Sequence, residues 1–214
     1  MFFSKSADKP PGKGVHEDLV SSPRKYAKLA KVKDWRKTLS NFYESEFQLD
    51  GKRWSSVEHF YQGSKFKRGN PNFYAQFSLD SGSEISKDPC KAKRAGGKTG
   101  GGLRSKNIKM DPGFFVGKDK VFYRAMVAKF SQNLELGKIL LDTKNAQLLH
   151  KTRGIPLQRV FPLEAARETL RKMEYLARRF GVDLLLIQKC LKETARLRFL
   201  PEKKVLEILT VEKL

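Results

Sequence analysis

The sequence predicts a mainly α-helical fold, an α+β arrangement in which a compact single domain contains one small β-hairpin. Apolar residues recur at helical spacing in several segments after residue 117, which is the pattern of helices with one buried face. Residues 46–56 instead alternate apolar and polar side chains around Asp50-Gly51, a strong short-range signal for a hairpin. The chain has 214 residues, 39% of them hydrophobic, so it can bury one real core.

The two ends of the chain are predicted to differ from this domain. Residues 1–33 are rich in Lys, Ser, Pro and Gly and are expected to form a flexible basic tail, because such segments bury little apolar surface. Order is expected to begin near Trp35, and the domain to span residues 34–180. Residues 181–214 are expected to form a helical extension packed on the domain.

Helices account for most of the predicted elements. Ser55-Ser56-Val57-Glu58 fits a capping box, so a helix is expected to start there and to run to about Lys67. A second short helix is predicted over residues 70–79, and a helical turn at residues 88–95 within an irregular Gly- and Lys-rich region. Further helices are predicted over residues 117–133, 134–143, 161–181, 182–200 and 201–214.

The charge of the chain is unusual, with 44 Lys and Arg against 23 Asp and Glu and a formal net charge of +21. Such a surplus favours an anionic partner, either nucleic acid or a phosphate-bearing ligand. The alternative is a solubilising surface, which would mix the two signs more evenly.

Other classes of protein are disfavoured by the sequence. Cys90, Cys190 and the scattered histidines form no metal-binding pattern, so no metal or cofactor is expected. The sparse cysteines favour a reducing, intracellular compartment, cytoplasmic or nuclear. No apolar stretch is long enough to span a bilayer, and the N-terminus does not have the pattern of a secretory signal.

The densest chemistry lies in residues 39–66, LSNFYESEFQLDGKRWSSVEHFYQGSKF. Aromatic rings mixed with polar groups are what a pocket for a flat, polar ligand needs. Glu58, Gln62 and Lys65 are spaced to share one helix face, with Tyr61 beside it. Glu58 is either a capping residue or a carboxylate placed to contact a sugar, and spacing alone leaves both open. His59 is interpreted as a packing or hydrogen-bonding residue rather than a base.

Two further segments have alternative interpretations. Residues 91–106, KAKRAGGKTGGGLRSK, are not a P-loop, because Ala92 stands where the first glycine is needed. They are either a glycine-rich anion site with basic residues around it or a mobile basic loop. In residues 126–133, Met126 and Phe130 are predicted core residues, whereas Lys129 either extends to solvent or reaches into a polar pocket.

Three motifs, in residues 39–66, 92–97 and 126–150, together resemble the NADAR (YbiA-like) family, which is associated with NAD and ADP-ribose chemistry. The resemblance covers roughly residues 34–152, and Arg167 fits the family's terminal arginine. It implies a compact, mostly α fold and N-glycosidase activity. Some members cleave phosphorylated riboflavin-pathway intermediates, and others remove ADP-ribose from modified guanine in nucleic acid.

The resemblance also implies a site, with Glu58 as the catalytic carboxylate. Gly97, Phe114 and His150 depart from the residue types usual in the family, which leaves the substrate open. Phe42 or Tyr61 is expected to stack on a base, and lysines with glycine amides to neutralise a diphosphate. The expected substrate-binding residues are Ser40, Asn41, Phe42, His59, Tyr61, Gln62, Lys65, Gly96, Gly97, Lys98, Phe114, Lys129 and Arg153.

The expected activity is therefore that of a hydrolase, an N-glycosidase acting on a phosphorylated ribosyl substrate. The charge favours ADP-ribosylated guanine, in nucleosides or nucleic acid, with non-specific nucleic-acid binding through the basic surface and tail, and no membrane partner. Three alternatives remain: a glycosidase of riboflavin-biosynthesis intermediates, a non-catalytic ADP-ribose-binding module, and a basic nucleic-acid-binding protein with a vestigial pocket.

Overall fold

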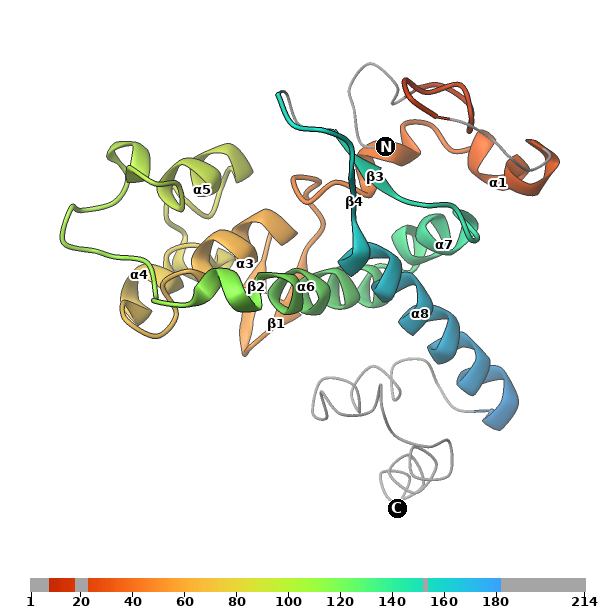
Figure 1. Cartoon of the computed structure of the whole chain (residues 1–214). Helices are drawn as coiled ribbons and strands as arrows, with labels where there is room; N and C mark the ends of the chain where they lie inside the picture. The colour runs from red at the N-terminus through yellow and green to blue at the C-terminus, as the bar shows by residue number, and fades with distance from the viewer. Residues whose placement is uncertain (1–7, 18–22, 152–153, 182–214) are drawn as a thin grey trace.

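The computed structural model describes residues 8–17, 23–151 and 154–181, and within these it is mainly helical with two small antiparallel sheets (Figure 1). The predicted fold class is therefore confirmed. Arg153 and the helical extension predicted after residue 181 lie outside the described residues.

The predicted hairpin is present and is anchored at its turn. Strand β1, Phe47–Leu49, pairs antiparallel with β2, Lys52–Trp54. Asp50 and Gly51 have φ angles of 55° and 70°, as a two-residue turn that matches the twist of the strands requires. The Asp50 carboxylate also pairs with Lys67, at 2.6 Å, and with Arg124. These ion pairs tie the hairpin turn to the turn after helix α3, Val57–Ser64, and to helix α6, Lys118–Gln132.

Short helices follow the hairpin. They are α3 (Val57–Ser64), α4 (Pro71–Ala75), η3 (Leu79–Ser81), α5 (Pro89–Ala95), η4 (Gly100–Gly102) and η5 (Phe114–Gly117). They form one side of the molecule (Figure 1). Three of them, α3, α4 and α5, lie within a few residues of their predicted positions.

Longer helices make up the rest of the described fold. They are α6 (Lys118–Gln132), α7 (Leu134–Asp142) and α8 (Phe161–Phe180). Between α7 and α8, β3 (Leu149–His150) pairs with β4 (Gln158–Arg159). This second sheet was not predicted, because two-residue strands are too short to show an alternating pattern.

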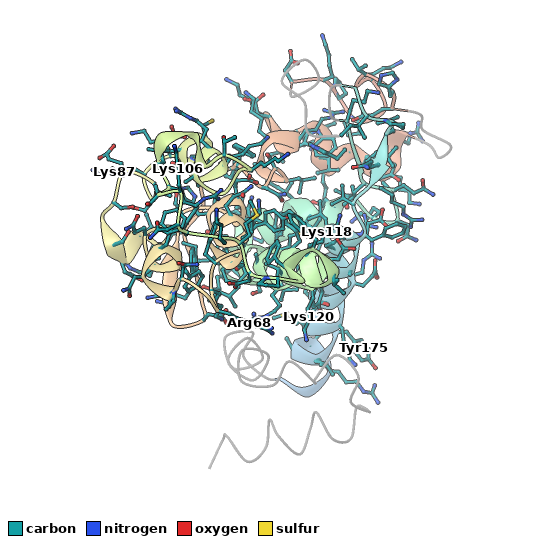
Figure 2. The ribbon with its side chains drawn as sticks, turned by 60° about the vertical axis from the view of Figure 1, so that its left-hand side comes forward. Arg68, Lys87, Lys106, Lys118, Lys120 and Tyr175 are labelled. Carbon is teal, nitrogen blue, oxygen red and sulfur yellow. The ribbon has the colours of Figure 1, made fainter. Side chains whose placement is uncertain are left out.

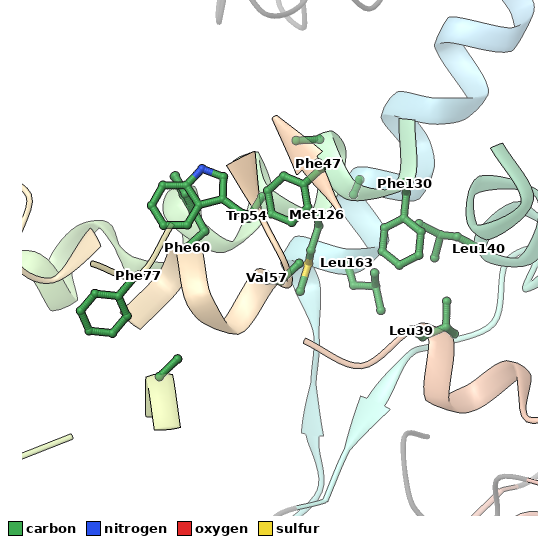
Figure 3. Close-up of a cluster of buried hydrophobic side chains, with 14 of the residues drawn as sticks. Leu39, Phe47, Trp54, Val57, Phe60, Phe77, Met126, Phe130, Leu140 and Leu163 are labelled. Atoms are coloured by element: carbon green, nitrogen blue, oxygen red, sulfur yellow. The ribbon is translucent and has the colours of Figure 1, made fainter. Parts of the chain in front are cut away.

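Helix α6 lies at the centre and packs against α3, α7, α8 and the hairpin. Figure 3 shows the buried side chains at this junction, with Trp54 and Phe60 on one side and Leu140 and Leu163 on the other. The Trp54 and Phe60 rings meet edge to face with their centroids 5.1 Å apart. Met126 and Phe130 are both buried on α6, so their predicted place in the core is confirmed.

The prediction of a flexible tail through residue 33 is wrong for the segments that the structure describes. Residues 23–30 form η2 (Pro23–Tyr26) and α1 (Ala27–Ala30), and Tyr26 and Leu29 are buried in the core. These two residues are three apart, so one helical turn places both on the same side. Composition averaged over the segment concealed this apolar pair.

Residues 9–17 are also held, by an arginine from the domain. Arg36 in α2 (Trp35–Thr38) is fully buried, and its guanidinium pairs with Glu17 at 2.6 Å and donates to the Pro10 carbonyl at 3.0 Å. A buried charge needs such partners, because burial removes its hydration. The N-terminal segment supplies them.

Candidate active site

Glu58 lies in the first turn of α3 with its side chain only 5% exposed. The Gln62 side-chain amide donates to Glu58 Oε1 at 2.8 Å. Burial raises the pKa of Glu58, while the Gln62 hydrogen bond and the charges of Lys93 and Lys65 act in the opposite direction. A carboxylate in this setting is suited to acid–base chemistry nearer to neutral pH than an exposed one.

The capping-box interpretation of Glu58 is wrong, because the helix begins one residue later than that pattern requires. Ser56 is the N-cap, and its hydroxyl accepts from the backbone N–H of His59. Glu58 therefore stands at the second helical position, and its carboxylate bonds Gln62 instead of the helix start. Its burial is not explained by capping.

Residues 39–42, which follow α2, form a loop beside Glu58, and this loop is fixed from two sides. The Glu58 backbone N–H donates to the Asn41 carbonyl at 2.9 Å. From α6, Lys129 Nζ donates to the carbonyls of Thr38 and Ser40, at 2.8 and 2.9 Å. The loop that carries Asn41 and Phe42 is thereby held against both α3 and α6.

The side chain of Lys129 reaches inward and does not extend to solvent. It is wholly buried, and burial lowers its pKa to about 7. Two of its donors are used on backbone carbonyls, so the structure gives it a positioning task. A direct contact between Lys129 and a diphosphate stays a prediction.

Lys65 follows the last turn of α3 and links it to the glycine-rich segment. Its Nζ donates to the Gly96 carbonyl at 2.8 Å, and burial lowers the pKa of Lys65 to about 8. Any Cβ on Gly96 would lie 2.2 Å from Gln62 Oε1. Gly96 is thus required for the close approach of α5 to α3, on the side that carries Glu58.

The expected role of the Gly96 and Gly97 amides in anion binding is not supported. Their N–H groups already donate to the carbonyls of Ala92 and Arg94, at 2.9 and 3.1 Å, where α5 ends. The following loop is held by Arg104, which donates to the carbonyls of Ala95 and Lys98 at 3.0 and 2.8 Å.

The aromatic residues near Glu58 differ in how much of each ring is free. Tyr61 stacks on Phe122, with ring centroids 3.9 Å apart and planes inclined by 12°, and meets the edge of Phe114 at 5.4 Å. One face of Tyr61 is therefore covered by the protein. Phe42 is half-buried, with Lys93 Nζ 5.2 Å from its ring centroid.

Two functional candidates were missed as site residues in the sequence. Lys93 acts electrostatically on Glu58 and on His150, whose pKa is lowered by burial and by this charge. Lys93 was visible only as one of several basic residues in a loop. Phe122 appeared only as one apolar position of a helix, with no sign that it covers Tyr61.

His59 and Arg167 serve the fold. His59 is fully buried with Nδ1 2.8 Å from Ser56 Oγ, and burial lowers its pKa to about 4. The packing interpretation is confirmed, and its expected role in substrate binding is not supported. Arg167 donates to Thr143 Oγ1 at 2.7 Å and to the Ala146 carbonyl at 2.9 Å, which joins α8 to the end of α7.

A cleft of about 720 Å³ opens beside Lys65. No acidic residue lines it in the described part of the chain. Figure 2 shows one of its lysines, Lys106, on the side of the molecule formed by α5 and the glycine-rich loop, away from Tyr175 on α8. The cleft is lined by five basic residues and an aromatic ring: Lys65, Lys98, Arg104, Lys106, Lys109 and Phe115.

A second, more open hollow of about 490 Å³ lies on α8, between Arg171, Tyr175 and Arg178. It includes Glu174 and is thus of mixed charge, and none of the residues around Glu58 lines it. Among the described residues, no group of three or more His, Cys, Asp or Glu could hold a metal ion. Within those residues, too, no helix has the length and apolar character needed to cross a membrane.

The fold and the site define a compact helical domain in which the buried Glu58 carboxylate lies on the helix that leads to Lys65, a residue of the basic cleft. A sequence profile of the NADAR domain matches residues 29–154, more than half of the chain. The chain therefore belongs to the NADAR family, and this membership supports a glycosidase-like function in general.

A solved structure agrees with this assignment at the level of the fold. The NMR structure of the E. coli protein YbiA superimposes with a TM-score of 0.52 at 24% identity, and the match covers 65% of this chain and 81% of that chain. At that identity the likeness shows the fold alone. No curated protein matches the chain.

Proposed function

We propose that this protein is an N-glycosidase that hydrolyses ADP-ribosylated guanine, in nucleosides or in nucleic acid. The observation that carries the proposal is the buried Glu58 carboxylate, oriented by Gln62 at 2.8 Å and influenced by the charges of Lys65 and Lys93. The basic cleft beside it supplies the charge that a phosphorylated substrate needs.

The reaction breaks the bond between C1 of the ADP-ribose sugar and a nitrogen of the guanine base. Positive, oxocarbenium-like charge develops at C1 as this bond lengthens, and a nearby carboxylate stabilises it. Glu58 would also accept a proton from the attacking water, whose oxygen bonds to C1. The leaving nitrogen takes up a proton, so that one water is consumed and the products are ADP-ribose and the unmodified guanine, still part of its nucleoside or polynucleotide.

The surrounding residues have supporting roles in this proposal. Gln62 fixes the orientation of the carboxylate, because its amide donates to one oxygen. Phe42 offers a half-buried ring beside Lys93 on which a base can stack. Lys65 and Lys98 would contact the diphosphate, since both line the cleft. Asn41 and Ser40 would form the edge of the pocket through the loop that Lys129 holds.

The net charge of the chain and the raised pKa of Glu58 favour this substrate over the alternatives. A riboflavin-pathway intermediate is a small free molecule and gives no reason for a net charge of +21. A module that only binds ADP-ribose has no need of a carboxylate with a raised pKa.

The test is to incubate the protein with ADP-ribosylated guanosine, free and within DNA or RNA oligonucleotides, and to measure released ADP-ribose by chromatography. We expect release by the wild-type protein and little by the Glu58→Gln variant. Tight binding of ADP-ribose without release would favour the binding module instead. Cleavage confined to phosphorylated riboflavin intermediates would identify the other substrate class.

A further inference from the structure

The cleft beside Lys65 holds positive charge that the protein does not neutralise. Lys65 and Arg104 direct hydrogen bonds to backbone carbonyls. Lys98, Lys106 and Lys109 are exposed, and their ammonium groups make no ion pair with any described residue. Three lysines are thus available to phosphates.

Two lysines near α5, unlike those of the cleft, are paired with a carboxylate. There Glu84 accepts from Lys87 and from Lys91, both at 2.7 Å, so these two lysines are already paired on the surface. A lysine next to a carboxylate attracts a phosphate less than an unpaired one does. Two of the basic residues in this region are thus neutralised, whereas Lys98, Lys106 and Lys109 line one cleft without such partners among the described residues.

An aromatic path leads from this cleft toward the candidate active site. Phe115 lines the cleft with its side chain 59% exposed. Its ring lies 5.5 Å from that of Phe114, and Phe114 lies 5.4 Å from Tyr61. Tyr61 belongs to α3, the helix that carries Glu58. An exposed phenylalanine among lysines is suited to stack a base whose phosphates are bound close by.

We propose that this cleft binds the single-stranded polynucleotide that flanks the modified nucleotide. Lys106 and Lys109 would contact backbone phosphates, and Phe115 would stack on a neighbouring base. A single strand is required because the bases of a duplex are already stacked on one another. The direction of the strand toward Glu58 rests on the proposed function, whereas the binding itself can be measured without turnover.

Binding is tested with unmodified, labelled DNA and RNA oligonucleotides of about 12 nucleotides, within the usual site size of such grooves. We expect the double variant Lys106→Gln/Lys109→Gln to lower affinity about tenfold. The negative slope of log K against log salt should become shallower by roughly 1.4. Phe115→Ala is expected to lower affinity by about tenfold through lost stacking. Comparing the DNA and RNA arms shows which polymer is bound more tightly.

The matched control is Lys31→Gln/Lys33→Gln, because it removes the same charge from two exposed lysines. These residues follow α1, at the opposite end of the molecule from α5 (Figure 1). We expect a clearly smaller loss of affinity than in the cleft variant, since these lysines contribute only non-specific attraction and the cleft stays intact.

Turnover separates this inference from the proposed function. The cleft variants should raise KM for a modified oligonucleotide and leave cleavage of free ADP-ribosylated guanosine unchanged. Cleft-dependent binding by a protein that cleaves neither substrate would support the inference while the proposed function fails. Equal losses in the cleft and control variants, no binding by wild type, or duplex binding as tight as single-strand binding would each overturn it.

Discussion

The Gln62 amide donates to Oε1 of Glu58 at 2.8 Å, one helical turn along α3. This hydrogen bond holds the carboxylate in one orientation within a site where both side chains are buried. Gln62 in turn lies directly against Gly96, where any Cβ would come within 2.2 Å of its Oε1. Gln62 on α3 and Gly96 at the end of α5 thus set the position of one acidic group.

Glu58→Gln is expected to lower turnover about a hundredfold or more, the usual worth of a positioned acid or base. The fold should persist, because Ser56 and not Glu58 caps the helix. Burial raises the pKa of this carboxyl above 4.5, so its ionised form costs stability at higher pH. The variant should therefore melt at the same temperature as wild type or higher at pH 8. Near wild-type turnover would show that Glu58 is not the reacting carboxylate.

The pH profile of kcat/KM is expected to be bell-shaped. Because burial raises the pKa of Glu58, its acidic limb should lie above pH 4.5. The alkaline limb should fall near pH 8, where Lys65 loses its charge. Lys65→Met should remove the alkaline limb, whereas Lys120→Gln, at an exposed position of α6, should leave it in place. An alkaline limb that persists in Lys65→Met would assign it to another group.

Lys129→Met is expected to lower the free energy of unfolding by about 2 kcal/mol, because two backbone carbonyls lose their donor. It should also raise KM, since the loop carrying Asn41 and Phe42 loses its anchor. Lys138→Met removes an exposed ion pair with Glu135 and should change stability by only about 0.5 kcal/mol. Chemical denaturation and steady-state kinetics measure both effects. Unchanged KM in Lys129→Met would show that the loop does not touch the substrate.

Gly96→Ala is expected to reduce kcat by more than about tenfold, because a Cβ there displaces Gln62 and with it Glu58. The added Cβ would also lie 2.7 Å from the Cβ of Gln62, so α5 must shift slightly, and we expect a folded protein with a lower melting temperature. Gly117→Ala is the matched control, since no atom lies within 4 Å of its added Cβ. If both variants have wild-type activity, the contact between Gly96 and Gln62 does not position the carboxylate.

Phe42→Leu and Tyr61→Leu are expected to separate binding from packing. Phe42→Leu should weaken substrate binding by on the order of 1–3 kcal/mol, the worth of one base–aromatic stack. Tyr61→Leu should chiefly lower the melting temperature, because its ring stacks on Phe122 at 3.9 Å. Calorimetry on the inactive Glu58→Gln background measures affinity without turnover. Weaker binding in Tyr61→Leu, with a lower melting temperature in Phe42→Leu, would show that the base stacks on Tyr61 instead.

The sequence by itself determined the elements whose cause is local. Asp50-Gly51 specified the hairpin, because its turn needs two residues that tolerate positive φ. The spacing of Glu58, Gln62 and Lys65 predicted one face of a helix, and all three are buried, the first two on α3 and Lys65 at its C-cap. Such features depend on residues within one or two turns along the chain, and these neighbours can be read directly from the sequence.

Only the tertiary structure decided which distant groups meet. Lys129 bonds carbonyls 89 and 91 residues away, and no periodicity indicates which carbonyls receive a buried ammonium. The same holds for Gly96 against Gln62, and for Tyr26 and Leu29 in a segment whose composition suggested a free tail. Many acceptors could pair with a buried donor, and many surfaces could pack against a glycine or an apolar pair. The packing of the whole chain selects one of them.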